Sequence, residues 1–81
     1  TPDEQRVKFI NITERIRSHK DFEQKYQNNP DVHTRELAFQ AILRDVMSER
    51  HRDELELYKL FAKDAAFRTA WTQSLQRALE Q

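Results

Sequence analysis

The chain contains no cysteine and no glycine, and only two of its 81 residues are proline. Without cysteine there is no disulfide framework, no cysteine-based zinc site and no thiol nucleophile. Without glycine there is no phosphate-cradling loop of the kind that many nucleotide-binding enzymes use. The absence of glycine and the scarcity of proline favour helices that are joined by short polar connections.

The chain also has no excess charge, because fourteen Lys and Arg residues balance fourteen Asp and Glu residues. A net charge of zero argues against a histone-like DNA binder and against a polybasic membrane anchor. No apolar run approaches the roughly 20 residues of a membrane span, and no signal peptide is recognisable. We therefore expect a soluble helical domain with no membrane partner. Because the chain begins at Thr1 rather than Met, we expect it to be a piece of a longer protein.

The first residues predict the start of a helix, with Thr1 as the N-cap, Pro2 in the first helical position and Glu4 completing a capping box. The apolar residues that follow share one helical face: Phe9, Ile12 and Ile16. Val7 and Ile10 lie off that face. The β-branched and aromatic residues leave a short strand as the alternative, but the cap and the lack of a partner strand favour a helix.

The rest of the chain predicts two or three more helices. A short helix over 21–27 places Phe22 and Tyr26 on one face, and the residues up to Pro30 and Asp31 form a connection. A long central helix is expected over 34–62, because no Gly or Pro interrupts this stretch, and Thr34 is expected to cap it. The alternative is two helices that meet at a bend near Arg50. The apolar face of the long helix carries Phe39, Ile42, Leu43, Val46, Leu57, Leu60 and Phe61.

Asp64 is expected to cap a last helix over 65–79, whose inner face carries Phe67, Trp71, Ser74, Leu75 and Ala78. The fold class is therefore all-α: residues 1–81 form a single domain, a helical hairpin or a small helical bundle of three to four helices with one long central helix.

No pattern predicts catalysis or a metal site within these residues. His19, His33 and His51 lie in separate segments, and none belongs to a His-Glu-x-x-His pair. His51 and Glu54 are three residues apart, but a surface ion pair is the favoured interpretation. A bundle of this size also has little room for the enclosed pocket that acid–base catalysis needs.

Two basic clusters are candidate DNA contacts: Arg15, Arg17 and Lys20 at the end of the first helix, and Arg50 and Arg52 in the middle of the long one. For the first cluster, the favoured structural alternative is that cations complement the negative end of a helix dipole. Neighbouring acidic residues weaken the second cluster. Tyr58 and Trp71 are candidate interface residues, although core packing explains Trp71 most simply.

Two runs of the sequence carry a family resemblance. The first begins at Asn29-Pro30-Asp31 and continues through 35–39 (RELAF) to Ile42 and Met47, and the second is 54–64 (ELELYKLFAKD), followed by Phe67 and Ser74-Leu75. In this order and spacing they resemble the extreme C-terminal region of the motor (R) subunit of type I restriction-modification enzymes. The resemblance covers 29–79.

The resemblance implies a large cytoplasmic parent, an ATP-dependent DNA translocase and endonuclease of the type I site-specific deoxyribonuclease class that uses ATP and Mg²⁺. Its nuclease carboxylates and ATP-binding motifs would lie outside these 81 residues. The chain itself would be non-catalytic and would dock the parent onto the methyltransferase core of modification and specificity subunits, with duplex DNA as a second partner. The alternative is an independent, self-associating helical interaction module.

Overall fold

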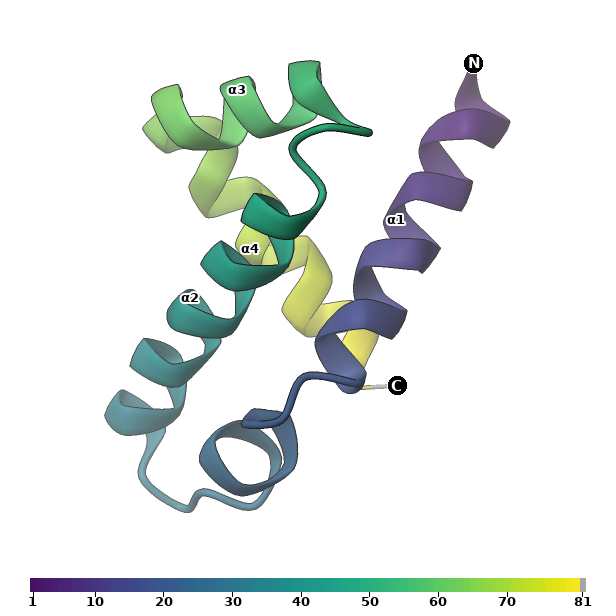
Figure 1. The fold of residues 1–81 in the computed structure, drawn as a ribbon. Coiled ribbons are helices and arrows are strands. Elements are labelled where there is room, and N and C mark those ends of the chain that lie inside the picture. Colours follow the sequence, from purple (N-terminus) through teal and green to yellow (C-terminus); the bar gives the residue numbers. More distant parts are fainter. Residues whose placement is uncertain (81) are drawn as a thin grey trace.

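The computed structural model describes residues 1–80, and these form four α-helices and one π-helix without any β-strand. The helices are α1 (Pro2–Arg17), η1 (Phe22–Gln27), α2 (Val32–Glu49), α3 (Leu55–Lys63) and α4 (Ala65–Leu79). In Figure 1, α1 and α2 form two legs that η1 joins at one end, while α3 and α4 form a hairpin whose second helix crosses behind α2 toward the end of α1. The predicted all-α class is confirmed.

The start of α1 follows its sequence signature. The Thr1 hydroxyl accepts a hydrogen bond from the backbone N–H of Glu4, the Glu4 side chain bonds back to the backbone N of Thr1, and Pro2 occupies the first turn. These contacts satisfy donors that the first turn of a helix leaves without partners. Ile12 and Ile16 are buried and Phe9 packs against them, whereas Val7 is 56% exposed, as the predicted face requires.

The short helix η1 is wound as a π-helix, in which the backbone N–H of Asn28 bonds to the carbonyl of Glu23 at 2.8 Å. It buries Phe22 and Tyr26, and the Tyr26 ring lies 5.0 Å from the Phe39 ring, measured between centroids. The pattern predicted the helix and the shared face of its two aromatic residues, but not its wider winding.

The N-cap of α2 is Asp31 rather than Thr34, so the predicted cap is wrong by three residues. The Asp31 carboxylate accepts hydrogen bonds from the backbone N–H of Thr34, at 3.0 Å, and from the Thr34 hydroxyl. Asn29 prepares this start, because its side-chain oxygen accepts the N–H of Asp31 at 3.0 Å. The aspartate directly after Pro30 therefore caps the helix, and Asn29, which precedes the proline, lies outside it.

The predicted continuous helix over 34–62 is wrong, because α2 ends at Glu49 and α3 begins at Leu55. The residues between them form a turn in which the backbone N–H groups of Asp53 and Glu54 both bond to the carbonyl of Arg50. Glu54 caps α3 without a side-chain hydrogen bond to its backbone. Its carboxylate instead pairs with Lys8 of α1, with 3.1 Å between Nζ and Oε2.

The core lies where α1, η1, α2 and the ends of the α3–α4 hairpin meet. Its buried apolar side chains are Ile12, Ile16, Phe22, Tyr26, Phe39, Ile42, Leu43, Val46, Met47, Phe61 and Leu75. Two side chains expected to face inward do not, because Leu60 and Ser74 are exposed. None of the helices in the described part of the chain is long and apolar enough to cross a membrane.

Candidate functional site

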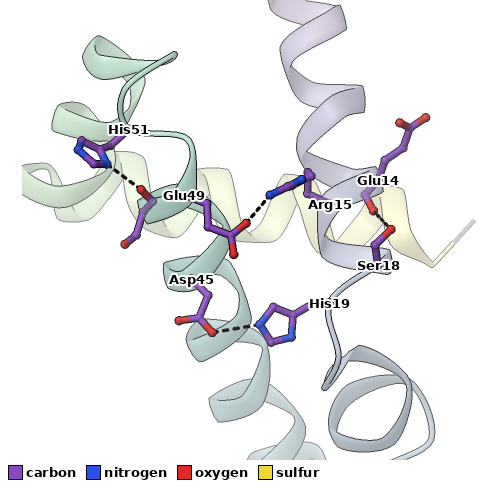
Figure 2. A network of polar contacts seen from close by, with 8 residues as sticks. Glu14, Arg15, Ser18, His19, Asp45, Glu49 and His51 are labelled. Atoms are coloured by element: carbon purple, nitrogen blue, oxygen red, sulfur yellow. Dashed lines mark hydrogen bonds and ion pairs between the residues drawn. The ribbon is translucent and has the colours of Figure 1, made fainter.

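Several polar side chains that could take part in binding or chemistry lie where the end of α1 meets the second half of α2 (Figure 2). Arg15, in the last turn of α1, forms an ion pair with Glu49 at the end of α2. Both side chains are about half exposed, at 51% and 56%. Exposed pairs of this kind contribute about 0.2–1 kcal/mol to stability.

His19 is the most enclosed polar group of this junction, with a side chain only 11% exposed. Its Nε2 lies 3.0 Å from Oδ2 of Asp45, and its Nδ1 accepts the backbone N–H of Asp21 at 3.1 Å. Because Nδ1 accepts a hydrogen bond, the geometry assigns the ring proton to Nε2, and this N–H donates a hydrogen bond to the carboxylate of Asp45. His19 thus fixes the segment after α1 against α2, a structural role that its position in the sequence did not indicate.

The neighbouring polar groups are also engaged in ending helices. The Ser18 hydroxyl donates to the carbonyl of Glu14 at 3.0 Å, and Nδ1 of His51 lies 2.7 Å from the carbonyl oxygen of Ser48. Each of these two carbonyls also accepts a backbone N–H, from Ser18 at 3.0 Å and from His51 at 3.4 Å, so the side chains add a second hydrogen bond at each helix end. The junction is therefore built for helix termination and packing.

The structure distributes the first predicted DNA-contact cluster over two places. Arg15 and Lys20 line a hollow of about 490 Å³ together with Asp45 and Glu49, whose carboxylates offset the positive charge. Arg17 points elsewhere, since its Nη2 donates to the carbonyl of Ala78 near the end of α4, at 3.4 Å. Arg17 thus contacts the last turn of α4, whereas the helix-dipole alternative referred to the end of its own helix.

The second basic cluster lies in the turn between α2 and α3 rather than on a helix. Arg52 is exposed, whereas Arg50 is half-buried and its Nε is enclosed without a hydrogen-bond partner among residues 1–80. Arg50 therefore offers less of its guanidinium to a partner than the sequence alone would indicate.

The two candidate interface aromatics both contact the core. Trp71 is half-buried between two rings: it meets Phe9 edge-on, with 5.6 Å between centroids, and stacks on Phe67 at 5.7 Å. The Tyr58 ring lies 5.5 Å from the His51 ring and joins α3 to the turn after α2. Core packing, the simpler explanation of Trp71, accounts for these contacts.

A groove between α2 and α4 was not predicted from the sequence. It has a volume of about 480 Å³ and mostly polar walls, because its two apolar lining residues, Leu43 and Phe61, are buried. Its lining residues are Glu36, Gln40, Leu43, Arg44, Phe61, Arg68, Thr69, Thr72, Gln73 and Gln76. Polar residues spaced by four on each helix were the available signal, but only the fold brings the two rows together.

Within residues 1–80, no three His, Cys, Asp or Glu side chains come together in a way that could hold a metal ion. Comparison of the chain with protein-family models, with curated proteins and with solved structures found no match.

Proposed function

We propose that this chain is a non-catalytic helical module that docks the motor subunit of a cytoplasmic type I restriction-modification enzyme onto its methyltransferase core. The proposal starts from the sequence resemblance described above. Its two runs fall on separate helices, since 35–39 lies in α2 and 54–64 includes all of α3. For docking, these helices must expose side chains to a partner as well as pack against the core.

The observation that carries the proposal is the pair of leucines that α3 leaves exposed, one on either side of its charged outer face. Leu55 and Leu60 are 47% and 43% exposed, and Leu60 lies in a shallow hollow beside Lys59 and Lys63. We call these four residues the α3 surface. The inner side of α3 packs chiefly on α4 through Phe61, so the outer side is left to solvent. A partner that covers the two leucines removes apolar area from water, which is the main favourable term in protein association.

The internal bonds of the polar residues also support assembly over catalysis. His19 and Arg15 each hold the end of α1 or the residues after it against α2, and His51 bonds to the carbonyl of Ser48 at the end of α2. Such a module contributes rigid shape and a surface, while the ATP and Mg²⁺ chemistry implied for the parent belongs to other parts of that subunit.

The test is co-elution of the purified chain with the assembled methyltransferase core of modification and specificity subunits. We expect a stable complex with the unmodified chain. Exchanging Leu55 and Leu60 together for serine should abolish it, because apolar contact area is replaced by hydroxyl groups. The matched control exchanges Val7 and Ile10, which are 56% and 45% exposed on α1 and lie outside the resembling segment. The control should leave the complex intact.

Two results would remove the proposal: no complex with the unmodified chain, or equal loss in both double variants. The same exposed leucines favour one other function, a self-associating helical module. Sedimentation of the chain alone separates the two. A mass of one chain at all concentrations fits docking onto another protein, whereas a dimer that dissociates in the Leu55 and Leu60 variant fits self-association.

A further inference from the structure

The turn between α2 and α3 carries an inference that goes beyond docking, because its sequence is compatible with a helix. Residues 48–54 contain no glycine and no proline, and no residue within 1–80 has a positive φ. The turn also keeps two hydrogen bonds of α-helical spacing. The N–H of Arg50 bonds to the carbonyl of Val46 at 3.2 Å, and the N–H of Glu54 bonds to the carbonyl of Arg50 at 2.8 Å. The local backbone therefore presents little obstacle to joining α2 and α3 into one helix.

The break leaves the start of α3 without a side-chain cap. Glu54 occupies the N-cap position but makes no side-chain hydrogen bond to the helix backbone. The N–H groups of the first turn of a helix have no helical partner, and a cap normally supplies one. In a continuous helix over 32–63 they would bond to the carbonyls of residues 51–53. Residues 48–54 would then be polar on every side, as in helices that cross water between two folded units.

Two contacts between side chains favour the bent form. Lys8 pairs with Glu54, with 3.1 Å between Nζ and Oε2, and the Tyr58 ring lies 5.5 Å from the His51 ring. His51 and Tyr58 are seven residues apart, so a continuous helix would separate them by about 10 Å along its axis and break their contact. The bent form therefore depends on side-chain contacts and on the core, not on the backbone of the turn.

The α3–α4 hairpin is tied together and can leave the core as a unit. Nη1 of Arg68 on α4 donates to the carbonyls of Phe61 and Ala62 at the end of α3, at 2.8 and 3.2 Å. The hairpin completes the core through Phe61 and Leu75, which are 7% and 0% exposed. Its departure would uncover the sides of α1 and α2 on which α4 packs. A hairpin of the same shape covers these sides again, and a second copy of this chain carries one.

We propose that two copies of this chain exchange their α3–α4 hairpins, and that α2 and α3 of each copy then form one helix over 32–63. Each hairpin packs on α1 and α2 of the other copy through the contacts that it makes within its own chain, which gives a dimer with two-fold symmetry. The exchange is slow, because each hairpin must first leave its core, so the freshly purified chain is monomeric. High concentration favours the dimer, since it offsets the freedom that two molecules lose on association.

The experiment measures a distance within one chain. Because the chain has no cysteine, nitroxide labels can be attached through His33→Cys and Lys63→Cys, at exposed positions at the start of α2 and the end of α3. In a continuous helix these positions lie about 45 Å apart. The longest dimension of the single chain is 37 Å.

The labelled chain is mixed with excess unlabelled chain, held at high concentration a few degrees below the thermal midpoint, and separated by size. Pulsed electron paramagnetic resonance should give about 45 Å in the dimer and a clearly shorter distance in the monomer.

The sequence of the turn supplies a second test. Arg52 and Asp53 are exposed, so the double variants Arg52→Ala/Asp53→Ala and Arg52→Gly/Asp53→Gly change helix propensity without altering the core. The alanine variant should dimerise at least about tenfold more tightly than the glycine variant, because alanine favours a helix interior and glycine opposes it. The control is the double exchange of Leu55 and Leu60 for serine. It should leave the dimer intact, because the exchange of hairpins does not use the α3 surface.

Four results would overturn the inference: no dimer in the alanine variant, the same distance within one chain in dimer and monomer, equal dimerisation of the alanine and glycine variants, or loss of the dimer in the Leu55 and Leu60 variant. The last result would indicate contact between intact copies through the α3 surface. All of these measurements use the chain alone, so their failure is distinguishable from failure of the docking proposal.

Discussion

Phe39 is the residue on which the proposed core depends most, and its truncation gives the sharpest test of the packing. Its side chain is fully buried on α2, and its ring meets that of Tyr26 at 5.0 Å, so that it joins η1 to α2. Phe-to-Ala changes in cores cost about 3–5 kcal/mol, from the lost burial and from the cavity left behind. An 81-residue domain has a total free energy of unfolding of about 4–12 kcal/mol at typical values per residue.

Phe39→Ala should therefore remove a large part of the stability. Each 1 kcal/mol shifts the thermal midpoint of a domain of this size by about 4–8 °C, so the expected fall is at least about 12 °C. The assay is thermal unfolding followed by far-ultraviolet circular dichroism. Leu37→Ala is the control, because Leu37 lies two residues earlier in the same helix and is 54% exposed. Its effect should stay within about 0.5 kcal/mol. Similar midpoints for the two variants would refute the assignment of the core.

Three further outcomes follow from local contacts. Asp64→Ala should lower the free energy of unfolding by about 1 kcal/mol in urea denaturation, because the Asp64 carboxylate accepts the N–H of Phe67 as the N-cap of α4; an unchanged midpoint would contradict that role. Burial raises the pKa of Tyr26, and Glu80 and Glu36 add to this, whereas Arg35 opposes it. Since the raised pKa belongs to the folded state, its stabilising effect is present below the unfolded value of about 10 and is lost as pH rises through the folded value; Tyr26→Phe should lack this alkaline loss in pH-dependent unfolding. Arg15→Gln should change stability by less than about 1 kcal/mol, and that difference should shrink in high salt; a larger, salt-independent loss would mean that the pair with Glu49 is not the exposed contact described.

The sequence was sufficient where the structure depends on local chemistry. The capping box at Thr1 and Glu4, the cap at Asp64 and the face of α2 from Phe39 to Val46 follow directly from residue types and spacing. Each involves groups at most a few turns apart. At these places propensity and periodicity were enough, whereas the cap of α2, which is also local, lies at Asp31 rather than Thr34.

The break between α2 and α3 was predicted only as the less favoured alternative, because its cause is tertiary. No Gly or Pro lies between Ser48 and Glu54, but no apolar residue lies there either, so a helix through this stretch would have nothing to bury. The turn lets Glu54 reach Lys8 on α1 and lets α3 return over α4 to bury Phe61. The Lys8–Glu54 pair joins residues more than forty positions apart, and local periodicity does not describe such contacts.

In the candidate site, too, the sequence indicated local features but not the partners that come from distant segments. The sequence identified Arg15 as a cation at the end of a helix, but Glu49, its partner, comes from another helix thirty-four residues later. The bridge between His19 and Asp45 spans twenty-six residues, and the α2–α4 groove exists only after both helices are placed. Pairing across the fold turns residues that look available in the sequence into structural contacts.

The measurement that tests the docking role most directly is competition against the complete enzyme. To test the proposal, a type I enzyme would be reconstituted from the motor subunit proposed to carry this sequence and a limiting methyltransferase core, and its ATP-dependent DNA cleavage would be followed as the isolated chain is added. If the chain occupies the docking position of the motor subunit, cleavage should fall toward zero at saturating chain, and the Leu55 and Leu60 double variant should not inhibit. Full cleavage at saturating concentrations of the folded chain would contradict the account.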